Sequence, residues 1–165
     1  MDSKISRRDL LTKASDIGAG LAIGATATAH AATTGVTIGS SVKTADYTKE
    51  KHVPVVDLPD GIKAGVPFIL TASVGKDVPH PNTTEHFIGW IALYFKADDG
   101  GPSTELAKFE FTSHGESALG PNKGATYSDP FGIAKVRLAK SGTIIAVSYC
   151  NIHGLWESST HVTVA

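Results

Sequence analysis

The segment Ile144-Ile145-Ala146-Val147-Ser148-Tyr149 decides the fold, because a short continuous run of mainly apolar residues is typical of a buried β-strand. The segment Phe87–Phe95 is apolar on both of its faces, as expected of a central strand in a β-sandwich. A third segment, Val66–Val74, is also expected to be a strand, with the side chains of Phe68, Leu70 and Ala72 on one face. The three segments together predict a protein built from β-strands.

Four further segments complete the set of expected strands: Val53–Val56, Leu106–Thr112, Ala134–Leu138 and His161–Val164. Pro54 confines the first of them to a sheet edge or a bend. Three turns rich in Gly, Pro, Asn or Ser separate the strands, at 98–102, 120–124 and 140–142. About seven short strands without a long helical period predict an all-β fold, an immunoglobulin-like antiparallel β-sandwich.

Length and charge limit the function classes. The 165 residues are enough for one domain with one core. With 15 basic and 16 acidic residues the charge is nearly balanced, and there is no Arg-rich tract. This composition argues against nucleic acid as a partner.

The beginning of the chain is expected to lie outside that domain. Ser6-Arg7-Arg8-Asp9-Leu10-Leu11 is typical of a twin-arginine export signal, and the small apolar stretch Ile17–Ala29 follows it. Ala29-His30-Ala31 provides an A-x-A cleavage site. We therefore expect residues 1–31 to be an export signal, residues 32–48 a linker and residues 49–165 the functional domain. Export by this route predicts a periplasmic or extracytoplasmic location.

Cys150 is the only cysteine in the chain, so it cannot form an intramolecular disulfide. It lies in a Cys-x-x-His motif with His153, and upstream the segment His80–His86 holds two more histidines and Glu50-Lys51-His52 another. A soft thiolate with several imidazoles is a transition-metal site, for which iron, copper and zinc are the candidates. Loops on a rigid sandwich are where such a site is easily built.

Two other interpretations use part of the same pattern. A cupredoxin-like electron-transfer protein also carries Cys and His on a sandwich loop, but it needs a His₂Cys set with a weak axial ligand such as Met, and the only methionine is Met1. The other alternative is a non-enzymatic module that binds zinc or a partner. Of the remaining histidines, His114 is a weaker ligand candidate and His161 is expected at the surface.

Three segments carry a resemblance to a known family: Glu50–Val55, Pro79–His86 and Ser148–Glu157. In order and spacing they are similar to superoxide reductase of the neelaredoxin type, within the desulfoferrodoxin iron-binding domain family. The resemblance implies a mononuclear iron centre, cycling between Fe²⁺ and Fe³⁺. It also implies a ligand set of four equatorial histidines and one axial cysteinate: His52, His80, His86, His153 and Cys150.

The same resemblance implies one-electron reduction of superoxide to hydrogen peroxide. Lys51 would supply positive charge at the open metal position, and Glu50 would be a possible sixth ligand of the ferric ion. An external one-electron donor, such as rubredoxin or another small redox protein, would reduce the iron again, and a homo-oligomer is possible. Phe87 and Gly89 differ from the residues common in the family and are expected to alter the rim of the site.

Overall fold

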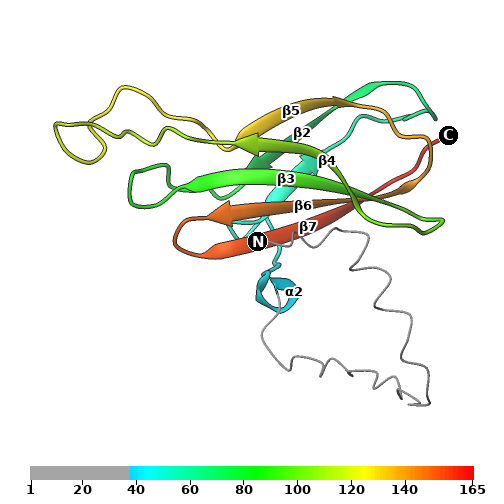
Figure 1. Ribbon diagram of the computed structural model, residues 1–165, viewed down its shortest axis with the longest axis horizontal. Helices are drawn as coiled ribbons and strands as arrows, with labels where there is room; N and C mark the ends of the chain where they lie inside the picture. Colours follow the sequence, from blue (N-terminus) through cyan, green and yellow to red (C-terminus); the bar gives the residue numbers. More distant parts are fainter. Residues whose placement is uncertain (1–37) are drawn as a thin grey trace, which may run out of the picture. The chain divides into compact units, whose positions relative to one another are not determined.

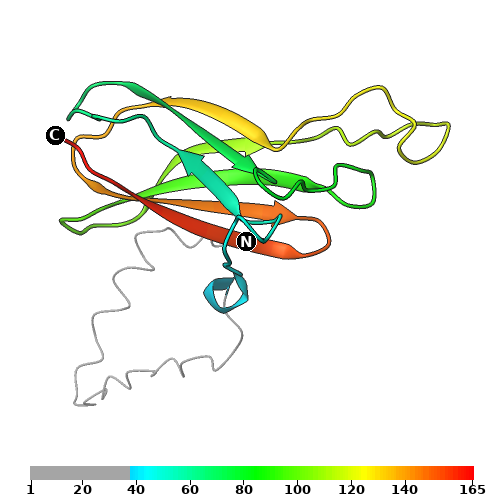
Figure 2. The ribbon, with the colours of Figure 1, turned by 180° about the vertical axis from the view of Figure 1, so that it is seen from behind.

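The structure is a computed structural model that describes residues 38–165, and they form two antiparallel β-sheets packed as a sandwich (Figures 1 and 2). The elements in chain order are α2 Ile38–Ser41, β1 Pro54–Asp57, β2 Phe68–Val74, β3 Ile88–Ala97, β4 Thr104–Glu110, β5 Phe131–Val136, β6 Gly142–Cys150 and β7 Gly154–Val162. One sheet has the order β1-β2-β5 and the other the order β4-β3-β6-β7. The predicted immunoglobulin-like antiparallel sandwich of seven strands is confirmed.

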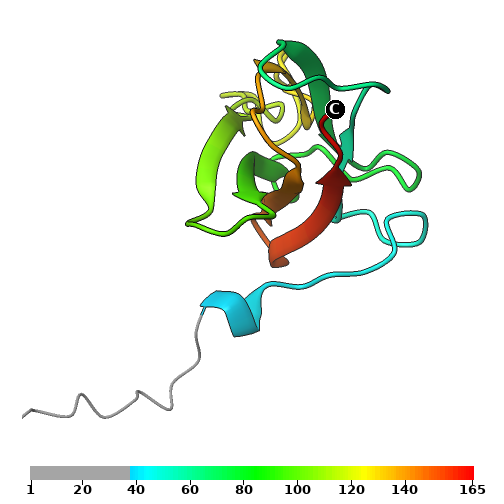
Figure 3. The ribbon, with the colours of Figure 1, turned by 90° about the vertical axis from the view of Figure 1, so that its right-hand side faces the viewer.

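The core lies between the two sheets and follows from alternation along the strands. In β6, every second side chain from Ile144 to Cys150 is buried, and in β2 the same holds for Leu70, Ala72 and Val74. Figure 3, which views the strands end on, shows the two sheets facing each other. The predicted apolar face of β2 therefore faces the core. Cys150 belongs to the same core cluster and has an exposed fraction of 0%.

Two expectations about the strands were wrong in detail. The segment 144–149 is not buried throughout, because Val147 and Tyr149 lie half-buried on the outer face of the sheet, where Tyr149 stacks on Trp90 with ring centroids 5.9 Å apart. The last strand begins at Gly154 and not at His161. Gly154 adopts a φ of 77°, so the chain turns back within three residues and β7 pairs with β6 along its whole length.

Three connections meet at one end of the sandwich, on the left in Figure 1. They are the connection between β2 and β3, the long connection between β4 and β5, and the turn of the β6–β7 hairpin. Backbone pairing joins two of them, because Asn151 donates its N–H to the carbonyl of Phe87 (3.2 Å). The segment before β1 reaches the same end, since Ser148 Oγ donates to the carbonyl of His52 (2.9 Å).

The described part of the segment 32–48 contacts the sandwich at the edge strand β7. The N–H of Lys43 donates to the carbonyl of Leu155 (3.0 Å), and the N–H of Glu157 donates to the carbonyl of Lys43 (2.8 Å). The ammonium of Lys43 lies over the ring of Trp156, 5.3 Å from the ring centroid. Within residues 38–165, helices of the length and apolarity needed to cross a membrane are absent.

Leu93→Ala is expected to destabilise the sandwich strongly. Leu93 is fully buried in the middle of β3, and removing its side chain leaves a cavity that costs about 2–5 kcal/mol. Urea unfolding measures the change in the free energy of unfolding. The matched control is Ile133→Ala on the outer face of β5, where the side chain is 59% exposed and little change is expected. Equal losses in both variants would contradict this description of the core.

Candidate metal centre

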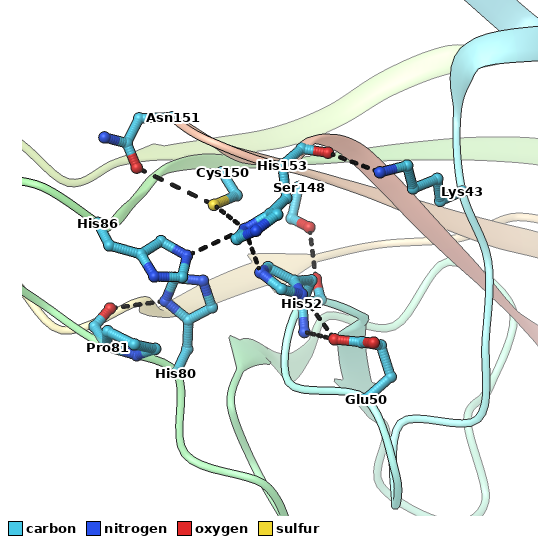
Figure 4. Close-up of polar contacts among 10 residues, drawn as sticks. All are labelled: Lys43, Glu50, His52, His80, Pro81, His86, Ser148, Cys150, Asn151 and His153. Carbon is cyan, nitrogen blue, oxygen red and sulfur yellow. Dashed lines mark hydrogen bonds and ion pairs between the residues drawn. The ribbon is translucent and has the colours of Figure 1, made fainter.

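Four side chains converge at the end of the sandwich where the connections meet (Figure 4). One potential ligand atom from each of His52, His86, Cys150 and His153 lies within 4.8 Å of the others. His153 Nδ1 is 3.0 Å from His52 Nε2, 3.2 Å from His86 Nε2 and 3.5 Å from Cys150 Sγ. The four donor atoms therefore surround one point in space.

These separations are those expected around a single metal ion. Two nitrogens bound at about 2.1 Å from one ion, at a right angle, lie about 3 Å apart. A soft thiolate beside several imidazoles selects a transition metal over a hard cation such as magnesium or calcium. The structure thus confirms a metal-type constellation of histidine and cysteine side chains, as the spacing of the motifs predicts.

Cys150 is held by the sheet and not by a flexible loop. It is the last residue of β6, pairs with Ile88 of β3 and Gly154 of β7, and is fully buried on the inner face. Its neighbour Asn151 accepts a hydrogen bond from the N–H of Phe87 (2.8 Å) and donates one to the carbonyl of Glu85 (2.9 Å). These two bonds fix the hairpin that carries Cys150 against the segment that carries His86.

His153 occupies the exposed tip of the same hairpin. Its carbonyl accepts a hydrogen bond from Lys43 Nζ (3.2 Å), visible in Figure 4. Lys43, whose backbone pairs with β7, therefore also contacts His153, a potential metal ligand. Sequence reasoning assigned residues 32–48 to a linker and gave no sign of this contact.

The ring of His52 is oriented by its neighbours. Its Nδ1 donates to Glu50 Oε1 (2.6 Å), which leaves the Nε2 lone pair directed at the cluster. The ring also stacks on Trp156, with centroids 4.9 Å apart and an interplanar angle of 13°. Burial lowers the pKa of His52, and the Glu50 carboxylate opposes that shift. The neutral imidazole, which is the metal-binding form, is thereby favoured.

His80 lies beside the four-residue cluster and is the fifth candidate. Its ring centroid is 4.8 Å from that of His52 and 4.5 Å from that of His86. Nδ1 donates to the carbonyl of Pro81 (2.6 Å), so the lone pair resides on Nε2, and that atom is buried with no hydrogen-bond partner. Burial lowers the pKa of His80 to about 4. An orphaned, neutral and buried imidazole nitrogen fits a metal ligand.

Two charged residues, Glu50 and Lys51, directly precede His52 in the chain. The positive charge of Lys51 is a minor cause, after burial and other groups, of the lowered pKa values of His52, His80 and His86. Glu50 points to the far side of the His52 ring, where burial raises its pKa and the hydrogen bonds from His52 more than offset this, giving a net lowering. In this arrangement the Glu50 carboxylate orients a ligand and does not occupy the centre of the cluster.

The other two candidate histidines lie elsewhere. His161 is exposed and contacts the Asp98 carboxylate (3.0 Å) at the opposite end of the β6–β7 pair, near Gly142. His114 is buried, and both of its ring nitrogens already have hydrogen-bond partners. Neither belongs to the cluster. Phe87 stacks on His114, with ring centroids 3.9 Å apart.

The comparison with known proteins agrees with this geometry. The family model described as Desulfoferrodoxin matches residues 44–159. Neelaredoxin of Megalodesulfovibrio gigas is 47% identical over 122 residues, which is 74% of this chain and 94% of that protein. A solved structure from Thermotoga maritima has a TM-score of 0.77 and 49% identity, and covers 79% of this chain and 99% of that chain.

A second solved structure is superoxide reductase (neelaredoxin) from Archaeoglobus fulgidus in the reduced form, with a TM-score of 0.70 and 42% identity. The match covers 75% of this chain and 99% of that chain. The family model covers every residue of the metal-type cluster, from His52 to His153. The chain belongs to the desulfoferrodoxin family.

Proposed function

We propose that this protein is a superoxide reductase, which converts superoxide to hydrogen peroxide by adding one electron and two protons. The observation that carries the proposal is the convergence of a buried thiol and histidine nitrogens on one point, in a chain of the desulfoferrodoxin family. The orphaned Nε2 of His80 adds a fourth imidazole, one more than the three histidines already grouped with the cysteine. Four imidazoles exceed the His₂Cys set of a blue-copper protein.

The cofactor of the proposed reaction is one iron ion, held by His52, His80, His86, His153 and Cys150. The donor chemistry fits this group, since thiolate and imidazole both bind iron. When bound, the ion supplies the electron that superoxide accepts. The thiolate of Cys150 would donate electron density to the bound ion, and the four imidazoles would complete the protein ligands.

Lys51 is proposed to attract the superoxide anion. Lys51 directly precedes His52, and its positive charge is a minor cause of the lowered pKa values of His52, His80 and His86. An ammonium beside a small site raises the local concentration of an anion and holds a water from which a proton reaches the product. Glu50 is proposed as a sixth ligand of the ferric ion. To reach that position its carboxylate must first release the Nδ1 hydrogen of His52.

Return to the reduced state is assigned to an external one-electron donor, such as rubredoxin or another small redox protein. His153 lies at the exposed tip of its hairpin, so one proposed ligand is accessible to a partner. We also propose export by the twin-arginine route to a periplasmic or extracytoplasmic location. The motif that supports export lies in residues 1–31, outside the described residues.

Cys150→Ser tests the proposed function directly. The oxidised iron protein should show a visible sulfur-to-iron charge-transfer band and reduce superoxide, and the serine variant should lose both, because its hydroxyl stays protonated and donates poorly. The fold should persist, since Ser148 already occupies the same buried face of β6. Visible absorption, circular dichroism and a superoxide assay provide the readouts. A serine variant that keeps the band would exclude Cys150 as a ligand.

Replacing each of the four proposed histidine ligands by alanine should weaken iron binding by roughly tenfold or more. The decisive variant is His80→Ala, because the ligand atom of His80 lies outside the compact four-residue cluster. Iron per chain, measured after equilibration with a competing chelator, is the readout. His161→Ala is the control, with no expected change. Full iron occupancy in His80→Ala would remove His80 from the ligand set.

Lys51→Ala should slow the second-order reaction with superoxide by roughly tenfold at low ionic strength, because the variant lacks the charge that attracts the anion. Added salt should slow the wild type and leave the variant less affected, because salt screens the attraction. Pulse radiolysis measures both rates. Lys49→Ala is a matched control two residues away, where the side chain is 81% exposed and pairs with Asp46 (3.4 Å). Identical rates in all three proteins would leave Lys51 without a steering role.

A further inference from the structure

The β4–β5 connection contains a buried histidine that the proposed reaction does not use. His114 is 3% exposed, and its ring lies against two parts of the segment that carries His80 and His86. Nδ1 is 2.7 Å from Asn82 Oδ1, and the ring stacks on Phe87 with centroids 3.9 Å apart at 13°. Nε2 is 2.9 Å from the carbonyl oxygen of Phe111. A neutral imidazole carries only one N–H, so it can donate a hydrogen bond to only one of these two oxygens.

The hydrogen-bond partners require a hydrogen on each ring nitrogen. The carbonyl of Phe111 only accepts, so Nε2 of His114 must donate. The Asn82 amide nitrogen donates to the carbonyl of Ser128 (3.1 Å), which turns the amide oxygen toward His114. That oxygen also only accepts, so Nδ1 must donate as well. Turning the amide over would set two acceptor oxygens against each other at Ser128.

The surroundings suit a positive ring. Glu116 accepts a hydrogen bond from the backbone N–H of His114 (2.7 Å). That bond is the largest cause that lowers the pKa of Glu116 and keeps its carboxylate ionised. The face of Phe87, stacked on the ring, would attract a positive charge there. The backbone of Tyr127 pairs with that of His114. The Tyr127 hydroxyl donates a hydrogen bond to the carbonyl of Asn122.

We propose that His114 is a positioning residue that, with a hydrogen on both ring nitrogens, holds the segment bearing His80 and His86 in place. Asn82 lies two residues after His80, and Phe87 follows His86, so the ring contacts the segment beside both histidines. That role rests on the proposed metal centre, whereas the hydrogen-bond arrangement does not. His114 touches no reacting atom and acts through Asn82 and Phe87 alone.

A second residue of the same connection supports this role. Asn122 accepts a hydrogen bond from the N–H of Thr84 (2.8 Å) and donates one to the carboxylate of Glu85 (2.7 Å). It adopts a φ of 58°, in the left-handed region, which asparagine tolerates better than most residues. The β4–β5 connection therefore holds the ligand segment at its middle through Asn122 and near both histidines through His114.

The protonation of His114 is tested on the wild-type chain. Nitrogen-15 NMR of histidine-labelled protein, loaded with diamagnetic zinc in place of iron, reports the hydrogen on each ring nitrogen. Both nitrogens of His114 should carry hydrogen at neutral pH. A ring with one bare nitrogen would overturn the proposal. The measurement needs no activity, so a protein that failed to reduce superoxide would count against the proposed function only.

The positioning role is tested with His114→Leu, Asn82→Ala and the double variant. Hydrogen exchange should become faster at the Thr83 and His86 amides, which bond to each other's carbonyls (3.1 and 3.2 Å). Iron should dissociate roughly tenfold faster in either single variant, and the charge-transfer band should shift. The double variant should lose no more than the stronger single one, because the two residues act as one unit.

His161→Leu is the matched control, because His161 is a non-ligand histidine whose ring contacts the Asp98 carboxylate (3.0 Å) at the other end of β7. It should leave exchange, iron release and the band unchanged. If His114→Leu does not fold, Asn82→Ala and the nitrogen-15 spectrum decide. Unchanged exchange at Thr83 and His86 in Asn82→Ala would overturn the positioning role, and additive losses in the double variant would overturn the link between His114 and Asn82.

Discussion

Crowded lone pairs at His153 Nδ1 are the constraint on which the site depends. Three other potential ligand atoms, on His52, His86 and Cys150, lie 3.0 to 3.5 Å from that nitrogen. Lone pairs so close repel one another unless a cation or a shared hydrogen lies between them. The sandwich makes the arrangement possible, because Cys150 is fixed in the sheet and the segments of the other donors are tied to it or to each other by hydrogen bonds.

Burial contributes to metal binding by keeping the histidines neutral. It is the largest cause that lowers the pKa of His52, His80 and His86, and a neutral imidazole is what a metal requires. The choice of ligand nitrogen comes from hydrogen bonds on the opposite side of two of the rings. Glu50 holds Nδ1 of His52, and the Pro81 carbonyl holds Nδ1 of His80. The thiol, by contrast, is placed by main-chain pairing.

The sequence predicted those features that depend on local pattern or on rare chemistry. The seven expected strands and their turns were sufficient for the fold class. The Cys-x-x-His motif, the upstream histidines and the family resemblance together predicted the cluster of His52, His86, Cys150 and His153. Contacts between segments distant in the chain were not predicted. A lone histidine such as His114 has no sequence pattern that separates a buried hydrogen-bonded ring from an exposed one, and its partner Asn82 is 32 residues away. The start of β7 at Gly154 was missed because the turn before it lies within the Cys-x-x-His motif, which was interpreted as a metal-binding loop.

The donors also come from far apart along the chain: His52 and His153 are separated by 101 residues, and His86 and His153 by 67. Contacts of such high sequence separation form late, because loop closure must be completed before they are gained. The four-residue cluster is therefore complete only when the first and last strands have joined the sandwich. A metal ion that binds only the completed cluster would stabilise the folded state over the unfolded state by mass action.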